Sequence, residues 1–150
     1  MPRVEPHRLA DYPHHQQITT RWMDNDAYGH VNNVHFLSYF DTVVNTYLIG
    51  RGALDIQKSP VIGLVVETGC QYLAPLTYPE EVTAGLRVGH IGRSSVRYEI
   101  ALFGQGAQNA AAQGHFVHVY VDRDSRRPVD LPDRLRGALE PILVTAQEAP

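Results

Sequence analysis

The chain has 150 residues and a formal net charge of −3, with 43% hydrophobic and 19% charged residues. These proportions are typical of one globular domain with a core of its own. Because the net charge is negative, there is no general attraction to nucleic acid, and none is expected as a partner. The single cysteine, Cys70, excludes an intrachain disulfide and favours a reducing compartment.

The N-terminal residues carry no targeting or membrane signal. No apolar run approaches the roughly 20 residues that span a bilayer, and residues 1–15 lack the apolar segment of a signal peptide. We therefore expect a cytoplasmic protein with no membrane partner. Residues 1–15, rich in proline and histidine, are predicted to be a flexible arm before a domain at residues 16–150. The adjacent histidines His14 and His15 are usually solvated on such an arm, so no metal site is predicted there.

A helix over residues 34–49 is the clearest predicted element, after a short strand at residues 17–22. One face of this helix is apolar, formed by Phe36, Phe40, Val43, Val44, Tyr47 and Leu48. Asn32 or Asn33 can cap its start, and Gly50 and Gly52 mark its end. Such a helix is about 24 Å long, enough to form the core of a small domain.

The segment 24–33 lies between that strand and the helix and is rich in reactive side chains. It places two carboxylates, a histidine and two capping amides just before a helix N-terminus, where free N–H groups and the positive end of the helix dipole gather. This arrangement suits chemistry on a carbonyl, although a turn with a helix cap explains the same residues. The segment also matches the first half of a calcium loop, but its twelfth position is His35 instead of glutamate, so no metal is predicted.

The remaining chain predicts strands joined by turns. A polar connector at residues 51–59 precedes a β-branched strand at residues 60–73, and Pro75 and Pro79 bracket a turn. Two segments then alternate strictly between apolar and polar residues, which indicates strands buried on one face. Their apolar residues are Val82, Ala84, Leu86 and Val88, then Val96, Tyr98, Ile100 and Leu102.

Folding the chain about Gly92 gives a predicted register for these two strands. All predicted pairs join apolar residues and lie on one face of the sheet. They are Val88 with Val96, Leu86 with Tyr98, Ala84 with Ile100, and Val82 with Leu102. The same register sets Arg87 opposite Arg97 on the other face. Because opposed like charges destabilise a sheet, the two arginines indicate an anion or an acidic neighbour, unless both extend into water.

A second hairpin is predicted between Gly104 and Gly114. The last strand then places three valines on one face and His118 and Tyr120 on the other, and a short helical segment follows near residues 131–139. An antiparallel sheet with one apolar face and a helix with one apolar stripe can bury both by curling the sheet around the helix. The predicted class is α+β.

The run from Arg21 to Asn33, followed by Phe36, Tyr39, Phe40 and Asp41, closely resembles the opening of the hotdog-fold acyl-CoA thioesterases of the 4-hydroxybenzoyl-CoA thioesterase family. The motif covers about twenty residues, and the order of elements fits over roughly residues 16–140. The resemblance implies a curled antiparallel sheet wrapped around one long central helix. It also implies a homodimer or homotetramer with active sites at the subunit interface, acting on acyl-CoA without a cofactor.

The resemblance also assigns roles to individual residues. It makes Asp26, and not Asp24, the catalytic carboxylate, and it places the amide that polarises the thioester carbonyl near Asn33. The hairpin that would hold the phosphates of coenzyme A falls on Arg93, Ser94 and Ser95.

The chemistry of a thioester fits these groups without reference to a family. Its leaving thiol has a pKa near ~8.5, so it departs without a strong general acid. A carboxylate that activates water or attacks directly, together with one N–H donor for the oxyanion, is then sufficient. Whether Asp26 is base or nucleophile stays open. His30 either orients the carboxylate or caps and packs, and Tyr28 either lines the acyl channel or fills the turn.

Two other functions remain open from the sequence. A hotdog enoyl-CoA hydratase or dehydratase would also use an acidic residue and a histidine near the helix start. A non-catalytic acyl-CoA binding module would need neither. The acyl group itself, whether aliphatic, aromatic or bound to a carrier protein, is not indicated by any residue. The sequence has no Gly-x-Ser-x-Gly motif, so it does not indicate a serine hydrolase.

Overall fold

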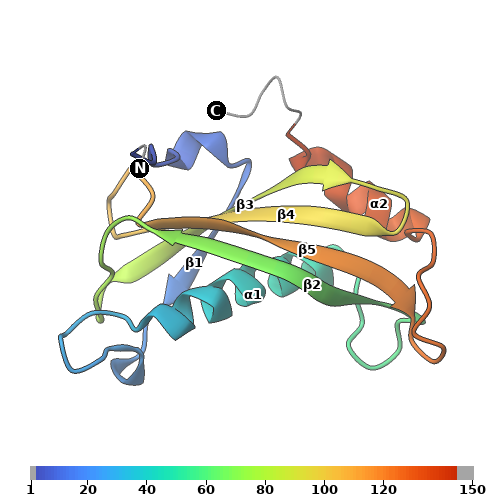
Figure 1. Ribbon diagram of the computed structural model, residues 1–150, viewed down its shortest axis with the longest axis horizontal. Helices are drawn as coiled ribbons and strands as arrows, with labels where there is room; N and C mark the ends of the chain where they lie inside the picture. Colours follow the sequence, from blue (N-terminus) through green and yellow to red (C-terminus); the bar gives the residue numbers. More distant parts are fainter. Residues whose placement is uncertain (1–2, 145–150) are drawn as a thin grey trace.

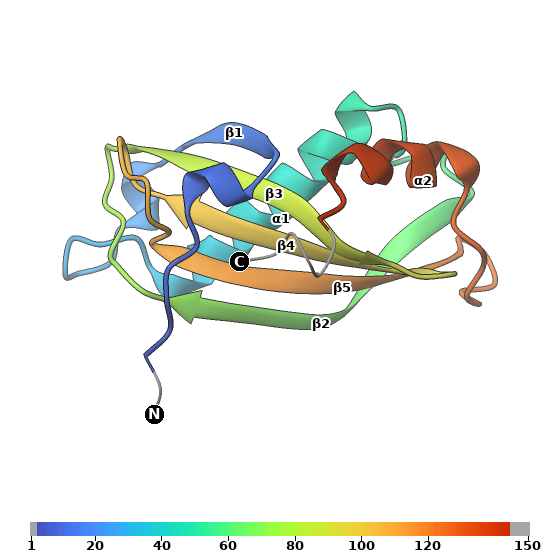
Figure 2. The same cartoon turned by 90° about the horizontal axis from the view of Figure 1, so that it is seen from above.

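The computed structural model describes residues 3–144 and has a helical layer packed on one antiparallel sheet (Figure 1). The sheet order is β1-β3-β4-β5-β2, so β1 and β2 form opposite edges (Figure 2). The strands are β1 (His14–Thr19), β2 (Val61–Tyr72), β3 (Glu81–Ile91), β4 (Ser95–Phe103) and β5 (Ala112–Asp122). The helices are α1 (Asn33–Gly50), α2 (Asp133–Leu139) and three short 3-10 helices, η1 (Leu9–Asp11), η2 (Trp22–Asp24) and η3 (Glu140–Ile142). The predicted α+β class is confirmed.

Helix α1 extends the predicted range by one residue at each end. Asn32 is its N-cap, because its side-chain oxygen accepts a hydrogen bond from the Val34 amide at 3.1 Å. Gly52, with φ +70°, follows the last turn. The predicted apolar face is buried against the sheet, joined by Tyr39. The 18 residues of α1 are not the whole helical layer, since α2 packs beside its end and Tyr47 Oη donates to Ala138 O at 2.6 Å.

The predicted register of β3 and β4 is wrong by two residues. Val88 pairs with Tyr98 instead of Val96, and an irregularity between Val88 and His90 shifts the pairing again near the turn. Because side chains alternate with period two, a slip of two residues keeps every apolar residue on the same face. The alternation therefore identifies the buried face correctly and cannot distinguish these registers.

The corrected register removes the predicted opposition of two arginines. Arg87 pairs with Glu99, and the Glu99 carboxylate accepts from Arg87 Nε at 2.8 Å and from Arg97 Nε at 2.9 Å. The predicted acidic neighbour is thus Glu99 itself. Burial opposes ionisation of Glu99, but the hydrogen bonds from both arginines outweigh it and lower its pKa. The Arg87 guanidinium also lies 4.7 Å from the centre of the Tyr12 ring.

The N-terminal segment differs from its predicted boundary. Strand β1 begins at His14, so the boundary expected between residues 15 and 16 falls inside it, and the strand expected at residues 17–22 ends at Thr19. Before β1, the His7 amide donates to Gln113 Oε1 at 2.7 Å. Tyr12 is buried in a second apolar cluster with Ala101, Phe103 and Ala110.

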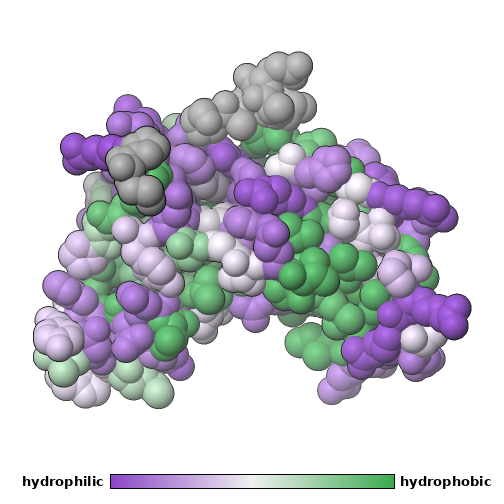
Figure 3. Space-filling model, in the orientation of Figure 1, coloured by the Kyte–Doolittle hydropathy of each residue, from purple (hydrophilic) through white to green (hydrophobic). Residues whose placement is uncertain are grey.

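Strand β2 forms an edge of the sheet and agrees with the predicted strand at residues 60–73. It pairs with β5 on one side, with a register shift between Val65 and Glu67. Val65 and Val66 are exposed at 50% and 60%, and Figure 3 shows an apolar patch over this strand. Among the described helices, none is both long and apolar enough to cross a bilayer.

Candidate active site at the start of helix α1

The loop before α1 is closed by its own backbone. The Asp26 amide donates to His30 O at 2.8 Å, and the Gly29 amide donates to Asp26 O at 3.1 Å. Gly29 has φ +82°, which a residue with a side chain rarely adopts. The Val31 amide also donates to Leu76 O at 2.7 Å. The loop is therefore held in one shape where α1 begins.

Asp24 anchors this loop from beneath. Its side chain is fully buried and accepts hydrogen bonds from Tyr39 Oη at 2.6 Å and from the Arg21 amide and Nε, both at 3.0 Å. Burial disfavours its charged form, but the hydrogen bonds from Tyr39 and Arg21 dominate and lower the pKa of Asp24. Because its lone pairs are occupied and it is shielded from water, Asp24 is a structural carboxylate.

Asp26 lies two residues further on and has a different environment. It is partly exposed, and its Oδ1 accepts from the Tyr28 amide at 2.8 Å in a local turn. Its second carboxylate oxygen accepts no hydrogen bond from residues 3–144. One oxygen thus fixes the side chain while the other faces the surroundings.

The first turn of α1 presents a free donor. The Val34 amide is capped by Asn32, and the His35 amide donates to Asn32 O at 2.9 Å. The exposed Asn33 amide has no acceptor within the part of the chain that the structure describes. A free N–H at this position has the positive end of the helix dipole behind it and suits an oxyanion.

The two other predicted residues of this loop do not contact the Asp26 carboxylate through their side chains. Tyr28 is 87% exposed, and its backbone amide is what binds Asp26. His30 is also exposed, and its carbonyl, not its ring, accepts from Asp26. The geometry supports a loop-shaping role for His30 through its backbone.

The predicted phosphate hairpin lies at the other end of the sheet. Arg93 is 87% exposed and pairs with the exposed Asp130 beside an open hollow that Ser94 also lines. The Leu131 amide donates to Arg93 O at 2.9 Å, which places the hairpin next to the start of α2. Strand β3 runs from the site end to this hairpin, and its length of roughly 35 Å separates the two within one chain. Ser95 is the first residue of β4.

Comparisons with known proteins identify the family. The model of the thioesterase-like superfamily matches residues 20–139. The chain belongs to this superfamily. The PA5185 protein from Pseudomonas aeruginosa strain PAO1 is 54% identical, with 92% of this chain and 96% of that chain covered and a TM-score of 0.90. A thioesterase from Thermus thermophilus, complexed with coenzyme A and Zn, is 31% identical, with 88% and 95% covered and a TM-score of 0.73.

A solved structure of lower sequence identity has the same fold as this chain. The DHNA-CoA thioesterase from Staphylococcus aureus is 21% identical, with 78% of this chain and 79% of that chain covered and a TM-score of 0.71. Together these matches confirm the resemblance to hotdog-fold thioesterases, and the family supports thioester hydrolysis. Within residues 3–144, no group of three or more His, Cys, Asp or Glu side chains is arranged to hold a metal ion.

Sequence reasoning assigned no role to two residues of the candidate site. Tyr39 donates to Asp24; it was named only as a motif residue, and the further signal was a tyrosine on the buried face of the helix, whose hydroxyl needs a partner. Tyr72, at the end of β2, donates to Asn33 O at 3.3 Å, and its ring centre lies 5.1 Å from that of Phe36. Tyr72 and Phe36 come from segments far apart in the sequence, and no local pattern connects them.

Proposed function

We propose that this protein hydrolyses an acyl-CoA thioester to the free acid and coenzyme A. The observation that carries the proposal is that one loop and the helix start that follows it present two groups, the Asp26 carboxylate with one oxygen free and the Asn33 amide without an acceptor among the described residues. A carboxylate and an oxyanion donor are the two groups that thioester hydrolysis needs. Membership of the thioesterase-like superfamily supports the same reaction.

Each group has a separate task in the proposed reaction. Asp26 either removes a proton from water or attacks the thioester carbonyl carbon, and the Asn33 N–H stabilises the negative charge that develops on the carbonyl oxygen. The buried Asp24 keeps the loop in place and does not exchange protons near neutral pH, since its pKa is lowered. Tyr28 and Tyr72 are exposed and offer aromatic surface near the helix start for the acyl group, and the buried Phe36 packs against the Tyr72 ring.

We further propose a homodimer in which β2 pairs with β2 of a second copy. The edge of β2 is unpaired within residues 3–144, and its exposed Val65 and Val66 form apolar surface at the same edge. An isologous antiparallel pairing sets the Tyr72 end of one β2 beside the Val61 end of the other.

Arg93 and Asp26 lie far apart in one chain, and this dimer would bring Arg93 of the partner subunit near the Asp26 loop. Strand β2 begins at the end of the sheet that carries the β3–β4 hairpin, since Val61 pairs with Asp122 and the Tyr120 amide donates to Ser94 O at 2.7 Å. Antiparallel pairing therefore brings the partner's hairpin toward the Asp26 loop. Arg93, Ser94 and Ser95 of the partner subunit would then hold coenzyme A phosphates, in accord with the coenzyme A bound to the Thermus thermophilus relative.

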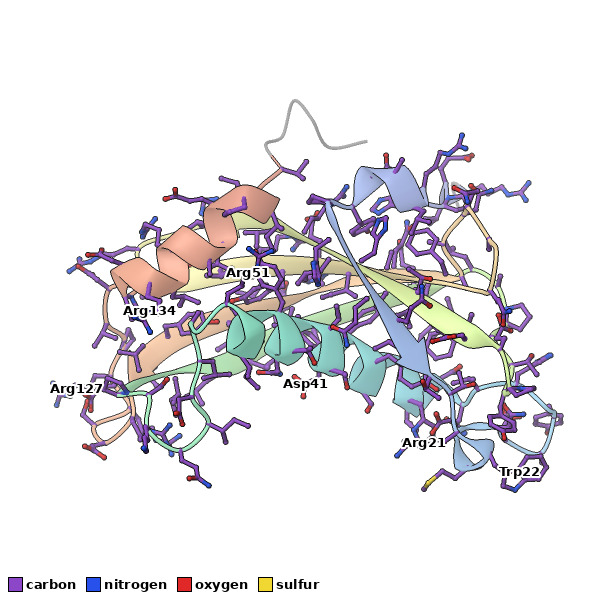
Figure 4. All side chains as sticks on the ribbon, turned by 180° about the vertical axis from the view of Figure 1, so that it is seen from behind. Arg21, Trp22, Asp41, Arg51, Arg127 and Arg134 are labelled. Atoms are coloured by element: carbon purple, nitrogen blue, oxygen red, sulfur yellow. The ribbon has the colours of Figure 1, made fainter. Side chains whose placement is uncertain are left out.

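Replacing Asp26 tests the proposed reaction directly. In a thiol-release screen over acyl-CoAs of different length and ring content, Asp26→Asn should lower kcat by at least ~10²-fold on the best substrate, because the amide has neither basicity nor nucleophilicity. Asp41→Asn is the matched control. Its carboxylate lies on the outer side of α1 and bonds only to Asn45 among the described residues (Figure 4).

Other outcomes would contradict the proposal. Full turnover by Asp26→Asn would remove Asp26 from the mechanism, and a large loss in Asp41→Asn alone would move the reaction to the middle of the helix. Release of no thiol from any acyl-CoA, despite tight binding, would support a binding module. Loss of the double bond of an enoyl-CoA without free thiol would support a hydratase.

A further inference from the structure

A cavity of about 220 Å³ lies between the last turns of α1, the start of β2 and the start of α2. Most of its wall is aliphatic, including Leu48, Leu54, Val61 and Leu135, and β5 contributes His118 and Tyr120. No Asp, Glu, Lys or Arg side chain of the described residues lines it. An ionised ligand would therefore lose its hydration without gaining a counter-ion.

This cavity is separate from the Asp26 loop of the same chain. Asn45, which lines it, follows Asn33 along α1 by roughly 18 Å at the rise of an α-helix. Figure 4 shows the two ends of the helix, with Arg21 and Trp22 near its start and Arg51 and Arg134 near its end. The cavity lies at the Arg51 end of α1, away from the Asp26 loop of the same chain.

His118 gives the cavity a polar group without a partner. The side chain is only 5% exposed, and Nε2 is buried without a hydrogen bond. Within residues 3–144, Nδ1 makes no hydrogen bond either, and its ring is packed among Tyr98, Phe116 and Tyr120. Burial lowers the pKa of His118 to about 4, so the ring is neutral at physiological pH, with one donor and one acceptor nitrogen.

Gly63 packs directly against the rings of His118 and Tyr120. A Cβ at this position would lie 3.0 Å from His118 Nδ1 and 2.9 Å from Tyr120 Cε1. Any side chain here would press on both rings, so only a glycine allows β2 to approach His118 this closely. Gly63, His118 and Tyr120 all line the cavity, so this close packing forms one of its walls.

We propose that this cavity binds an uncharged, ring-sized alcohol or phenol whose hydroxyl pairs with His118. The volume is sufficient, since an apolar cavity of about 150 Å³ already holds benzene. A hydroxyl can both donate and accept, so it can pair with an unpartnered ring nitrogen of His118 whether that nitrogen is the donor or the acceptor. The aliphatic wall takes the remainder of the ligand, and the absence of charged lining residues excludes carboxylates and amines. The site goes beyond the proposed hydrolysis because it requires no thioester.

The test compares phenol with toluene, which has the same shape and lacks the hydroxyl. Isothermal titration of the full chain should show saturable binding of both, with phenol about tenfold tighter, as expected for one net hydrogen bond of roughly 1.4 kcal/mol. His118→Phe keeps the ring and removes both nitrogens, so this variant should bind toluene at least as tightly as phenol. Phenol should also shift the His118 ring nitrogen signals in an NMR titration of the wild-type protein.

Two glycine variants show where the ligand sits. Gly63→Ala should weaken both ligands at least tenfold, while Gly137→Ala in α2, where a Cβ meets nothing within 4 Å, should leave both affinities unchanged. The proposal is overturned if neither probe binds saturably, which would indicate water as the occupant. It is also overturned if His118→Phe retains the preference for phenol, or if the His118 signals stay fixed while phenol binds. The NMR result does not depend on any variant folding.

Discussion

Asp24→Asn tests whether the two neighbouring carboxylates of the loop have different roles. The wild-type carboxylate accepts from Tyr39 Oη and the Arg21 amide with one oxygen and from the Arg21 guanidinium with the other. In asparagine an NH2 group replaces one of these oxygens, and this new donor faces the donor groups of Tyr39 or Arg21. At least one buried hydrogen bond to a charged group is then lost, and a hydrogen bond of this kind contributes about 1.5–3 kcal/mol.

The expected loss for Asp24→Asn is about 2–3 kcal/mol of unfolding free energy. The Arg21 side chain is 55% exposed, so it can turn to water and adds little to that figure. For a chain of this size the loss corresponds to a fall of roughly 5–10 °C in Tm. Asp26→Asn is the control, because its one bond is exposed and an amide oxygen can accept it, and its change should stay within about 0.5 kcal/mol.

The pH dependence of stability gives a second measurement of Asp24. Its pKa is lower in the folded chain than the ordinary value near ~3.9, so its stabilisation is fully present above that value and is lost as the pH falls through the folded pKa. Urea denaturation between about pH 2 and 7 should show this loss in the wild type, and Asp24→Asn should remove it. Equal stability of the two asparagine variants at pH 7 would refute a buried anchoring role for Asp24.

Three further predictions concern the hairpin, the sheet edge and the buried arginine. Arg93→Ala should raise KM for an acyl-CoA several-fold and leave KM for the matching pantetheine thioester unchanged, whereas Arg134→Ala should change neither; equal effects on both substrates would remove the phosphate role. Val66→Lys at the exposed β2 edge should shift sedimentation toward the 16.8 kDa monomer, and an unchanged oligomer would place the interface elsewhere. Glu99→Gln should cost at least about 2 kcal/mol in urea, because it leaves the buried Arg87 without its anion, and a loss below about 0.5 kcal/mol would contradict that pairing.

The elements that were predicted well are those specified by local patterns. Helix α1 has an apolar stripe with a period of 3.6 residues and an asparagine cap, and both are visible in the sequence. The register of β3 and β4 was missed because a slip of two residues leaves the buried face unchanged. The irregularity that sets the actual pairing lies between Val88 and His90, at Gly89, and the alternation of apolar residues does not reveal it.

The candidate site was predicted in part for a similar reason. The motif located the Asp26 loop, but the separate roles of Asp24 and Asp26 depend on burial by Tyr39, fifteen residues away. The distance between the loop and the Arg93 hairpin follows from the length of β3 and from the sheet order. Neither can be obtained from the spacing of residues along the chain, because both depend on which strands become neighbours.

The N-terminal segment before β1 covers part of one face of the sheet. Tyr12 packs so closely on β3 that a Cβ at Gly85 would lie 2.8 Å from its ring, and it covers the Arg87 guanidinium. A shortened chain that starts after residue 13 would uncover this arginine together with Phe103, both buried at 3% exposure or less. A purification tag or fusion partner is therefore better attached before residue 7, because a chain boundary within residues 7–13 would expose these side chains. For protein production, residues 7–13 belong to the folded unit.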